Sequence, residues 1–334
     1  MSDKRDFKRV VQGTLAIIAV AWLVAFVAPI HSAGGKGIIL TIQRGEAADQ
    51  VYSTITRSHV VSNIVLFRIF SKIFGIDRKI KAGKYLLSGY YSDYDVMRLI
   101  SAGKSNLLVS VTIPEGMDTR QIAEICHHDL GVDSAAFARE ALGDSMAEVL
   151  GVPSSNLEGY LFPDTYDFYY GTKPGEIMKR MTDEFKFYFN DSLKERARVM
   201  GYTVNQIMTM ASIVEAEAQI DSERAIIASV YYNRLRKRMP LDADPTIEYA
   251  LGKHTEIYYK DLHIKSPYNT YENYGLPPTP ICSPGLKSIM AALYPDTTDY
   301  LYFVANGKGG HVFTVTFRAH KRAIRAYRRA MMRE

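Results

Sequence analysis

Cysteine is scarce in this sequence, with two among 334 residues. Cys126 and Cys282 lie far apart, and neither stands in a metal-ligand spacing. The adjacent His127 and His128 would project about 100° apart on a helix, which makes them a poor pair of ligands. We therefore interpret both cysteines as free thiols, and we expect neither a metal nor a cofactor.

The signatures of nucleic-acid-binding proteins are also missing. The formal net charge is a mild +5, and there is no zinc-finger spacing and no aromatic-plus-basic RNA motif. Much of the positive charge lies near the C-terminus, in Arg318, Lys321, Arg322, Arg325, Arg328, Arg329 and Arg333. A basic last helix is typical of a solvated face, and it would also suit an acidic polymer or an anionic lipid. We expect no nucleic-acid partner.

Charge is absent from one long stretch, VVQGTLAIIAVAWLVAFVAPI, at residues 10–30. Its length is close to the ~20 residues that cross a bilayer as a helix. Four basic residues precede it, and such a flank favours the cytoplasm. The pattern predicts a cytoplasmic tail at 1–9 and a transmembrane helix at 10–30, with the rest of the chain outside the cytoplasm.

A cleaved signal peptide is the alternative interpretation of this stretch. The following IHSAGG offers small residues for cleavage, and no lipid-attachment cysteine follows. The apolar region of a signal peptide is usually about 7–15 residues, which is shorter than this run. A retained anchor is therefore favoured.

An internal repeat links two segments of the chain. LTIQRGEAADQVYSTI (40–55) resembles VTIPEGMDTRQIAEIC (111–126), and Gly45 aligns with Gly116. Each pattern predicts a strand, a turn at the glycine, an amphipathic helix and a second helix. The first copy closes with a further strand at IKAGKYLLS. The predicted β-α-α-β unit is either a carbohydrate-binding module or a structural spacer.

A carboxylate interrupts an apolar helix pattern at ASIVEAEA, residues 211–218. On a helix, Glu215 and Glu217 lie about 160° apart, one at each edge of the apolar stripe. A charged carboxylate in apolar surroundings is costly. Glu215 is therefore either an edge residue that reaches water or an acid kept protonated for a substrate.

Aromatic residues gather in NLEGYLFPDTYDFYYG, residues 156–171. Such a cluster can form a platform for sugar rings, or it can be a core strand beside a turn. The pattern leaves both alternatives open.

The sequence is similar to the YceG-like endolytic murein transglycosylases. The resemblance runs from the anchor to nearly the last residue. It rests on six motifs in chain order, VTIPEGMDTRQIAEI, LEGYLFPDTY, ASIVEAEA with SERAIIASVYYNRL, MPLDADPTIEYALG, YNTYENYGLPPTPICSPG and YLYFVANGKGGHVFT.

This resemblance implies an α+β protein with a single N-terminal transmembrane helix, a LysM-like β-α-α-β module at 36–110 and a mixed α+β catalytic domain at 111–334. The catalytic domain would include a repeat start at 111–142. The implied enzyme is a single-pass lyase of the inner membrane, with its catalytic domain in the periplasm. It would cleave MurNAc–GlcNAc bonds, form 1,6-anhydro-MurNAc ends and limit glycan strand elongation. Its implied partners are peptidoglycan glycan strands, the inner membrane and peptidoglycan synthases of the elongation machinery.

The resemblance assigns catalysis to Glu215, the first glutamate of SIVEAEA. Relatives often have lysine between the two glutamates, so Ala216 here would remove a nearby cation. We also expect glycan contacts from Glu158, Tyr160, Tyr166, Glu217, Asn269 and Tyr271. For these residues a buried hydrogen-bonding role is an equal alternative. Ion pairs are expected from Glu217 and Glu223 to Arg224 or Arg234.

Two other functions fit the pattern. A non-catalytic peptidoglycan-binding scaffold would need no protonated acid. A hydrolytic muramidase would use Glu215 as acid and a distant carboxylate, such as Asp244, as base. A lytic transglycosylase needs only one carboxyl group, because the C6 hydroxyl of MurNAc attacks its own C1. The products separate the three: anhydro ends, reducing ends or no cleavage.

Overall fold

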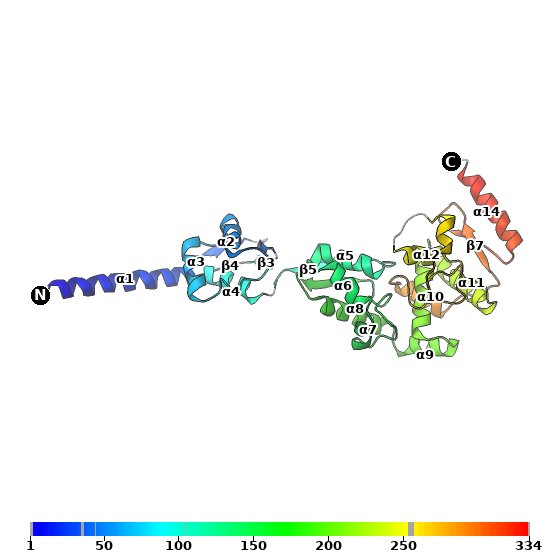
Figure 1. Cartoon of the computed structure of the whole chain (residues 1–334), viewed down its shortest axis with the longest axis horizontal. Helices are drawn as coiled ribbons and strands as arrows, with labels where there is room; N and C mark the ends of the chain where they lie inside the picture. The colour runs from blue at the N-terminus through cyan, green and yellow to red at the C-terminus, as the bar shows by residue number, and fades with distance from the viewer. Residues whose placement is uncertain (1–2, 35–36, 44, 104, 253–256, 333–334) are drawn as a thin grey trace. The chain divides into compact units, whose positions relative to one another are not determined.

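The computed structural model describes residues 3–34, 37–43, 45–103, 105–252 and 257–332 (Figure 1). It is a mixed α+β structure with two compact units. The first unit consists of residues 1–109 and 167–172, and the second consists of 110–166 and 173–334.

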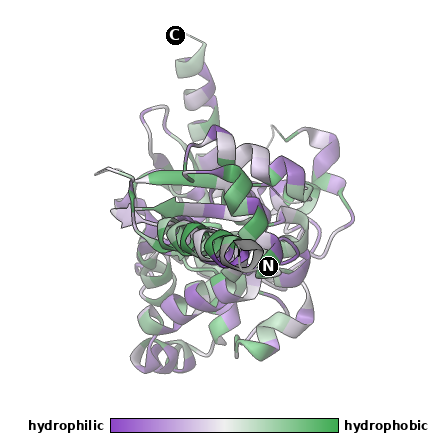
Figure 2. Cartoon of the chain, turned by 90° about the vertical axis from the view of Figure 1, so that its left-hand side faces the viewer, coloured by the Kyte–Doolittle hydropathy of each residue, from purple (hydrophilic) through white to green (hydrophobic). Residues whose placement is uncertain are grey.

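The first unit begins with the long helix α1 (Asp3–Val27), which Figure 2 shows as mostly hydrophobic. Its segment Phe7–Val27 is long and apolar enough to cross a membrane, and only 6% of the apolar window is buried. The helix ends at Val27 rather than at the predicted Ile30. Pro29 explains this difference, because a proline disfavours the helical conformation of the residue before it.

Four short strands and three helices follow α1 in the first unit. The strand β1 (His31–Ser32) pairs antiparallel with β4 (Tyr90–Tyr91), and β2 (Ile38–Ile42) pairs antiparallel with β3 (Gly83–Leu87). Between β2 and β3 lie α2 (Ala48–Arg57) and α3 (Ile64–Ile73). The predicted β-α-α-β order is therefore confirmed. We call residues 28–109 the membrane-side module.

The helix α4 (Asp93–Ala102) completes the module and is capped at both ends. The Ser92 hydroxyl accepts a hydrogen bond from the Asp95 N–H, and Gly103 ends the helix with φ 72°.

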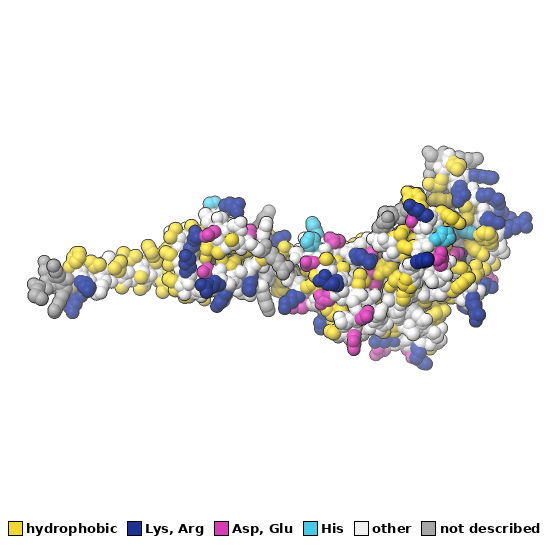
Figure 3. Space-filling model, viewed as in Figure 1, with side chains coloured by type: hydrophobic (Ala, Val, Ile, Leu, Met, Phe, Trp, Pro, Cys, Tyr) yellow, Lys and Arg dark blue, Asp and Glu magenta, His cyan; other side chains and the backbone are white. Residues whose placement is uncertain are grey.

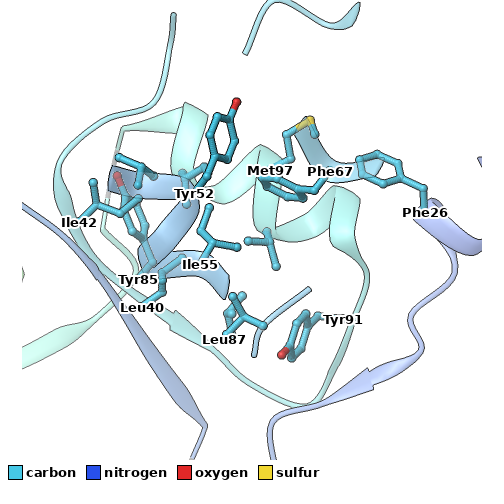
Figure 4. Close-up of a cluster of buried hydrophobic side chains, with 14 residues drawn as sticks. Phe26, Leu40, Ile42, Tyr52, Ile55, Phe67, Tyr85, Leu87, Tyr91 and Met97 are labelled. Carbon is cyan, nitrogen blue, oxygen red and sulfur yellow. The ribbon is translucent and has the colours of Figure 1, made fainter. Parts of the chain in front are cut away.

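The core of the module includes the end of α1 (Figure 4). Phe26 is only 2% exposed, and its ring centroid lies 4.4 Å from that of Phe70 and 6.5 Å from that of Phe67. Leu40, Ile42, Tyr85 and Leu87 project from β2 and β3 into the same core. The apolar helix and the module thus share one hydrophobic core.

The second copy of the repeat has the strand–helix–helix start of the first, with one more helix before its closing strand. The strand β5 (Leu108–Thr112) leads into α5 (Thr119–Leu130), α6 (Ser134–Ala141) and α7 (Asp144–Val149), and β5 pairs with β6 (Thr165–Tyr169). Gly45 and Gly116 have nearly equal φ values of 84° and 81°. Both glycines therefore make the same left-handed turn, which favours glycine, and the predicted repeat is confirmed.

The remainder of the second unit is mainly helical. Its elements are α8 (Pro174–Tyr188), α9 (Asp191–Met200), α10 (Val204–Glu217), the 3-10 turn η1 (Asp221–Glu223), α11 (Arg224–Arg236), α12 (Asp244–Leu251), the 3-10 turn η2 (Tyr259–His263), α13 (Leu286–Leu293), β7 (Tyr302–Ala305), β8 (His311–Thr314) and α14 (Phe317–Met331). The strands β7 and β8 form an antiparallel hairpin. Lys and Arg side chains gather over α14 in Figure 3.

The helix α10 is the centre of this unit. Every residue from Ile207 to Val214 is buried, and the helix packs against α11, α12 and α13. The Thr203 hydroxyl caps its first turn by accepting from the Gln206 N–H. Because the body of α10 is enclosed in this way, only its last turn, including Glu215, faces the loops that precede α5 and α13.

Candidate active site

Glu215 lies in the last turn of α10 with 7% of its side chain exposed. Its Oε1 accepts a hydrogen bond from Arg224 Nη1 at 3.0 Å, and its Oε2 accepts one from the Gly285 N–H at 2.9 Å. The first of these donors is a charged guanidinium and the second is a backbone amide. The side chain is thus fixed at both oxygens.

Arg224 at the start of α11 corrects the expectation of an apolar surrounding. It is itself 11% exposed, and it also donates to Asp221 at 3.1 Å and to the Ser288 hydroxyl. The sequence suggested that Ala216 leaves Glu215 without a nearby cation. The fold supplies the cation nine positions further on, because η1 turns the chain back toward α10.

Sequence reasoning missed a second carboxyl group at this place, that of Glu115. It lies in the loop between β5 and α5, which is tied to the loop before α13 by the Gly116 N–H to the Ser283 carbonyl at 2.9 Å. A methyl group on Gly285 would lie 1.9 Å from Glu115 Oε1, so this carboxyl group touches the residue that donates to Glu215. The only sequence signal was its place in the motif VTIPEG.

The charges around Glu115 shift its pKa in opposite directions. Burial raises the pKa of Glu115, and the Glu215 charge raises it further. Arg224 and Lys287 lower it, and Asp221 raises it by a smaller amount. The net direction is upward, so this carboxyl group holds its proton to a higher pH than an ordinary glutamate does.

Glu217 faces a different set of neighbours, as the helix geometry predicted. The Tyr231 hydroxyl donates to its Oε1 at 2.8 Å, and burial raises the pKa of Glu217 to about 7. Tyr271 donates to Asp244, and both lie close enough to interact electrostatically with Glu217. These residues form a polar cluster distinct from the contacts of Glu215.

Four of the predicted glycan contacts are buried and bonded inside the protein: Glu158, Tyr160, Tyr166 and Asn269. Glu158 accepts from the Thr119 N–H and the Tyr249 hydroxyl, both at 3.0 Å, and burial raises the pKa of Glu158 to about 7.

The other three have equally clear internal partners. Tyr160 donates to Asn205 at 3.1 Å, and Tyr166 donates to the Phe162 carbonyl at 2.6 Å. The Asn269 amide donates to the carbonyls of Leu262 and Ile264. These contacts favour the buried hydrogen-bonding role, and glycan contact by these residues stays a prediction.

The expected Glu223–arginine ion pair is wrong. Glu223 Oε2 instead pairs with His311 Nδ1 at 2.6 Å, and Oε1 accepts from the His311 N–H at 2.8 Å. Arg234 pairs with Asp242 at 3.0 Å. His311 lies on the β7–β8 hairpin, 88 residues after Glu223 in the sequence. Sequence patterns within a few residues cannot predict a contact over that separation.

Both cysteines are free and buried. Cys282 lies directly before the loop that contacts Glu215, and its Sγ donates to the Ser212 carbonyl at 3.3 Å. Within the described part of the chain, no group of three His, Cys, Asp or Glu side chains is arranged to hold a metal ion.

The profile of the YceG-like family matches residues 40–326. The chain belongs to the YceG-like family. The resemblance drawn from the six motifs is thereby confirmed, and the Glu215 site of this YceG-like protein falls within the matched residues.

Relatives of this YceG-like protein include two named endolytic murein transglycosylase. The Bacillus subtilis (strain 168) protein is 34% identical over 315 residues, which cover 90% of this chain and 87% of the relative. The Streptococcus pneumoniae serotype 2 (strain D39 / NCTC 7466) protein is 30% identical over 319 residues, which cover 85% of this chain and 57% of the relative.

Among solved structures, the crystal structure of a putative YceG-like protein from Listeria monocytogenes is similar, with a TM-score of 0.59 and 32% identity. The match covers 85% of this YceG-like chain and 98% of the Listeria chain. The similarity therefore extends over both units of the fold.

Proposed function

We propose that this YceG-like protein is an endolytic murein transglycosylase, a lyase that cleaves the glycan strands of peptidoglycan. The match to the Bacillus relative over most of both chains supports the activity. The Glu215 carboxyl group, held by Arg224 and the Gly285 N–H beside a second carboxyl group, supports Glu215 as the residue that carries out the reaction.

The chemistry requires two proton transfers at neighbouring atoms. The oxygen that links MurNAc C1 to GlcNAc must gain a proton as the bond breaks, and the MurNAc C6 hydroxyl must lose one as it attacks C1. The product is a 1,6-anhydro end, and no water is consumed. Glu215 can act at these atoms as general acid and general base in turn. The hydrogen bonds to both of its oxygens fix its orientation toward the substrate.

The test is product analysis with a matched pair of variants. Glu215→Gln keeps the shape of the side chain but cannot carry a proton, so we expect release of 1,6-anhydro-MurNAc fragments to fall by about 10²–10⁴-fold. Glu217→Gln, two residues away in the other cluster, should keep far more activity. Reducing ends from the wild type would indicate a muramidase, and no cleavage would indicate a scaffold. Near wild-type release by Glu215→Gln would remove Glu215 from the mechanism.

We also propose that α1 is a retained anchor in the inner membrane and that the rest of the chain lies in the periplasm. The basic flank before residue 10 and the burial of Phe26 in the module core support this arrangement. A periplasmic reporter fused after residue 40 should be active and membrane-bound. Recovery of a soluble, N-terminally trimmed protein would contradict the proposal.

The domain assignment follows the same proposal. Residues 36–110 would be a LysM-like module that contacts glycan, and residues 111–334 would be the catalytic domain. Cleavage beside peptidoglycan synthases of the elongation machinery would limit the length of new strands.

A further inference from the structure

The helix α3 exposes an apolar stripe on the surface of the membrane-side module. Val65, Ile69 and Ile73 are 61%, 45% and 68% exposed, and Phe74 after the helix is 48% exposed. Their spacing of four residues places them on one face of the helix. Phe67 on another face is fully buried in the core. A contiguous exposed apolar patch of this kind usually marks an interaction surface.

The position of α3 is fixed by its contact with the end of α1. The 21 residues of Phe7–Val27 span about 31 Å at about 1.5 Å per residue, which equals the hydrocarbon thickness of a bilayer. Phe26 therefore lies at the edge of the hydrocarbon layer. Because its ring packs on Phe70 and Phe67, α3 lies at the same level.

Basic side chains accompany the apolar stripe. Arg68 and Lys72 lie on α3, and Arg78 and Lys79 follow it, all of them exposed. Arg68 also pairs with Asp49. Figure 3 shows Lys and Arg side chains at the end of the module from which α1 emerges. An apolar face flanked by cations is the pattern of a helix that lies in a membrane interface.

We propose that α3 docks on the outer surface of the same membrane that α1 crosses. Val65, Ile69 and Ile73 enter the boundary between headgroups and acyl chains, and the neighbouring cations contact lipid phosphates. The partner is a lipid surface with anionic headgroups, since the stripe adjoins the only span-length apolar helix in the described residues. Two elements therefore hold the membrane-side module at the membrane: α1 crosses the bilayer, and α3 lies along its surface.

The experiment uses the full chain in nanodiscs that contain phosphatidylglycerol. An environment-sensitive fluorophore is attached through Ile69→Cys, since both natural cysteines are buried. The control label is attached through Gln43→Cys, an exposed position after β2 in the same module. Lipids with a quencher near the headgroup should quench the label at position 69 several-fold more than the label at 43. Equal, weak quenching at both positions would overturn the proposal and leave the stripe as a surface for a protein.

A second inference concerns Glu115 and rests on the proposed function. Glu215 is held at both oxygens, whereas no hydrogen bond or ion pair holds the Glu115 carboxyl group within the described parts of the chain. The two groups meet at Gly285, where any side chain would occupy the place of the Glu115 carboxyl group. The charged groups that face Glu115 are Glu215 on α10, Arg224 on α11, Asp221 on η1 and Lys287 on α13.

The geometry points to a division of the two proton transfers between Glu115 and Glu215, which replaces the successive acid and base roles of Glu215 alone. Glu115, in its neutral form, donates a proton to the GlcNAc oxygen as the bond to MurNAc C1 breaks. Glu215, as a carboxylate, takes the proton of the C6 hydroxyl as that oxygen bonds to C1. The pair starts and ends with one proton, and transfer from Glu215 to Glu115 restores the starting state.

The nature of the leaving group tests this division. A muramoyl substrate with an aryl leaving group needs no general acid, whereas a glycan strand does. We expect Glu115→Gln to lose at least 10²-fold in glycan cleavage and to stay within a few-fold of wild type on the aryl substrate. Glu215→Gln should lose both activities, because the C6 hydroxyl still needs a base. Equal losses of Glu115→Gln on both substrates, or full activity on glycan, would overturn the inference.

Gly285→Ala provides a second variant that keeps both carboxyl groups. Gly285 has an ordinary φ of −74°, so alanine suits the backbone, but its methyl group displaces the Glu115 carboxyl group. It should lower glycan cleavage and spare the aryl substrate. Absence of anhydro products from the wild type would instead refute the proposed function itself.

Discussion

At the scale of single residues, Arg224 decides how well the protein tolerates changes at Glu215. Glu215→Gln would leave a mostly buried guanidinium without its carboxylate, although Asp221 and Ser288 still contact it. We expect a loss of about 1–3 kcal/mol in the free energy of unfolding, measured by urea denaturation. An unchanged stability would show that Arg224 finds other partners at no cost.

Two buried carboxyl groups make the stability depend on pH. Burial raises the pKa of both Glu158 and Glu217 to about 7, so the folded protein retains protons that the unfolded chain releases from about pH 4.5. Stability should therefore fall as the pH rises from about 5 to about 7. The double variant Glu158→Gln and Glu217→Gln should flatten this slope in thermal melts, whereas Glu195→Gln on the surface should leave it unchanged.

At the scale of structural elements, Gly159 joins the aromatic segment to the loop before α13. Its φ is 80°, and a Cβ atom there would lie 2.3 Å from Pro280 Cβ. We expect Gly159→Ala to lower the free energy of unfolding by about 2–4 kcal/mol, from backbone strain and overpacking together. The matched control is Gly201→Ala, which has the same φ but no atom within 4 Å and should lose only about 1 kcal/mol. Equal losses would mean that Pro280 moves aside.

Structural elements that depend on interactions within a few residues could be predicted from the sequence. The periodic apolar residues of α10, the caps of α4 and the turn glycines of the repeat all act within a few residues, and the structure agrees with each. The start of α11 is harder to predict, because residues 221–223 form a 3-10 turn and the α-helix begins only at Arg224. The Glu223 side chain binds His311 rather than capping the helix.

The site was predictable only in part, for a related reason. Glu215 stands out because it breaks an apolar pattern along the chain. Glu115 breaks no pattern in its loop, and it reaches Glu215 only because the loop before α13 joins the two. Arg224 was expected to pair with Glu217 or Glu223 rather than with Glu215. Contacts of this kind depend on the tertiary fold, which periodicity does not report.

At the scale of the whole molecule, Phe26 makes the membrane-side module depend on α1. Phe26→Ala should lower the stability of the module by about 3–5 kcal/mol, because the ring fills a core position. The second unit, with its own core, should be unaffected. Hydrogen exchange in detergent would locate the change, with Phe7→Ala, an exposed position of α1, as the control. Equal exchange in both variants would contradict the shared core.

The same shared core affects how long a detached protein survives. A protease that cut between α1 and β1 would remove Phe26 and expose Phe67 and Phe70 to water. The released fragment would unfold more often, and unfolded chains are the ones that proteases degrade. Proteolytic release would thus lead to degradation of the fragment rather than to a pool of soluble protein that diffuses away. With α1 as the proposed anchor, the enzyme would act on the wall only where it is inserted, which confines a destructive activity to the cell that made it.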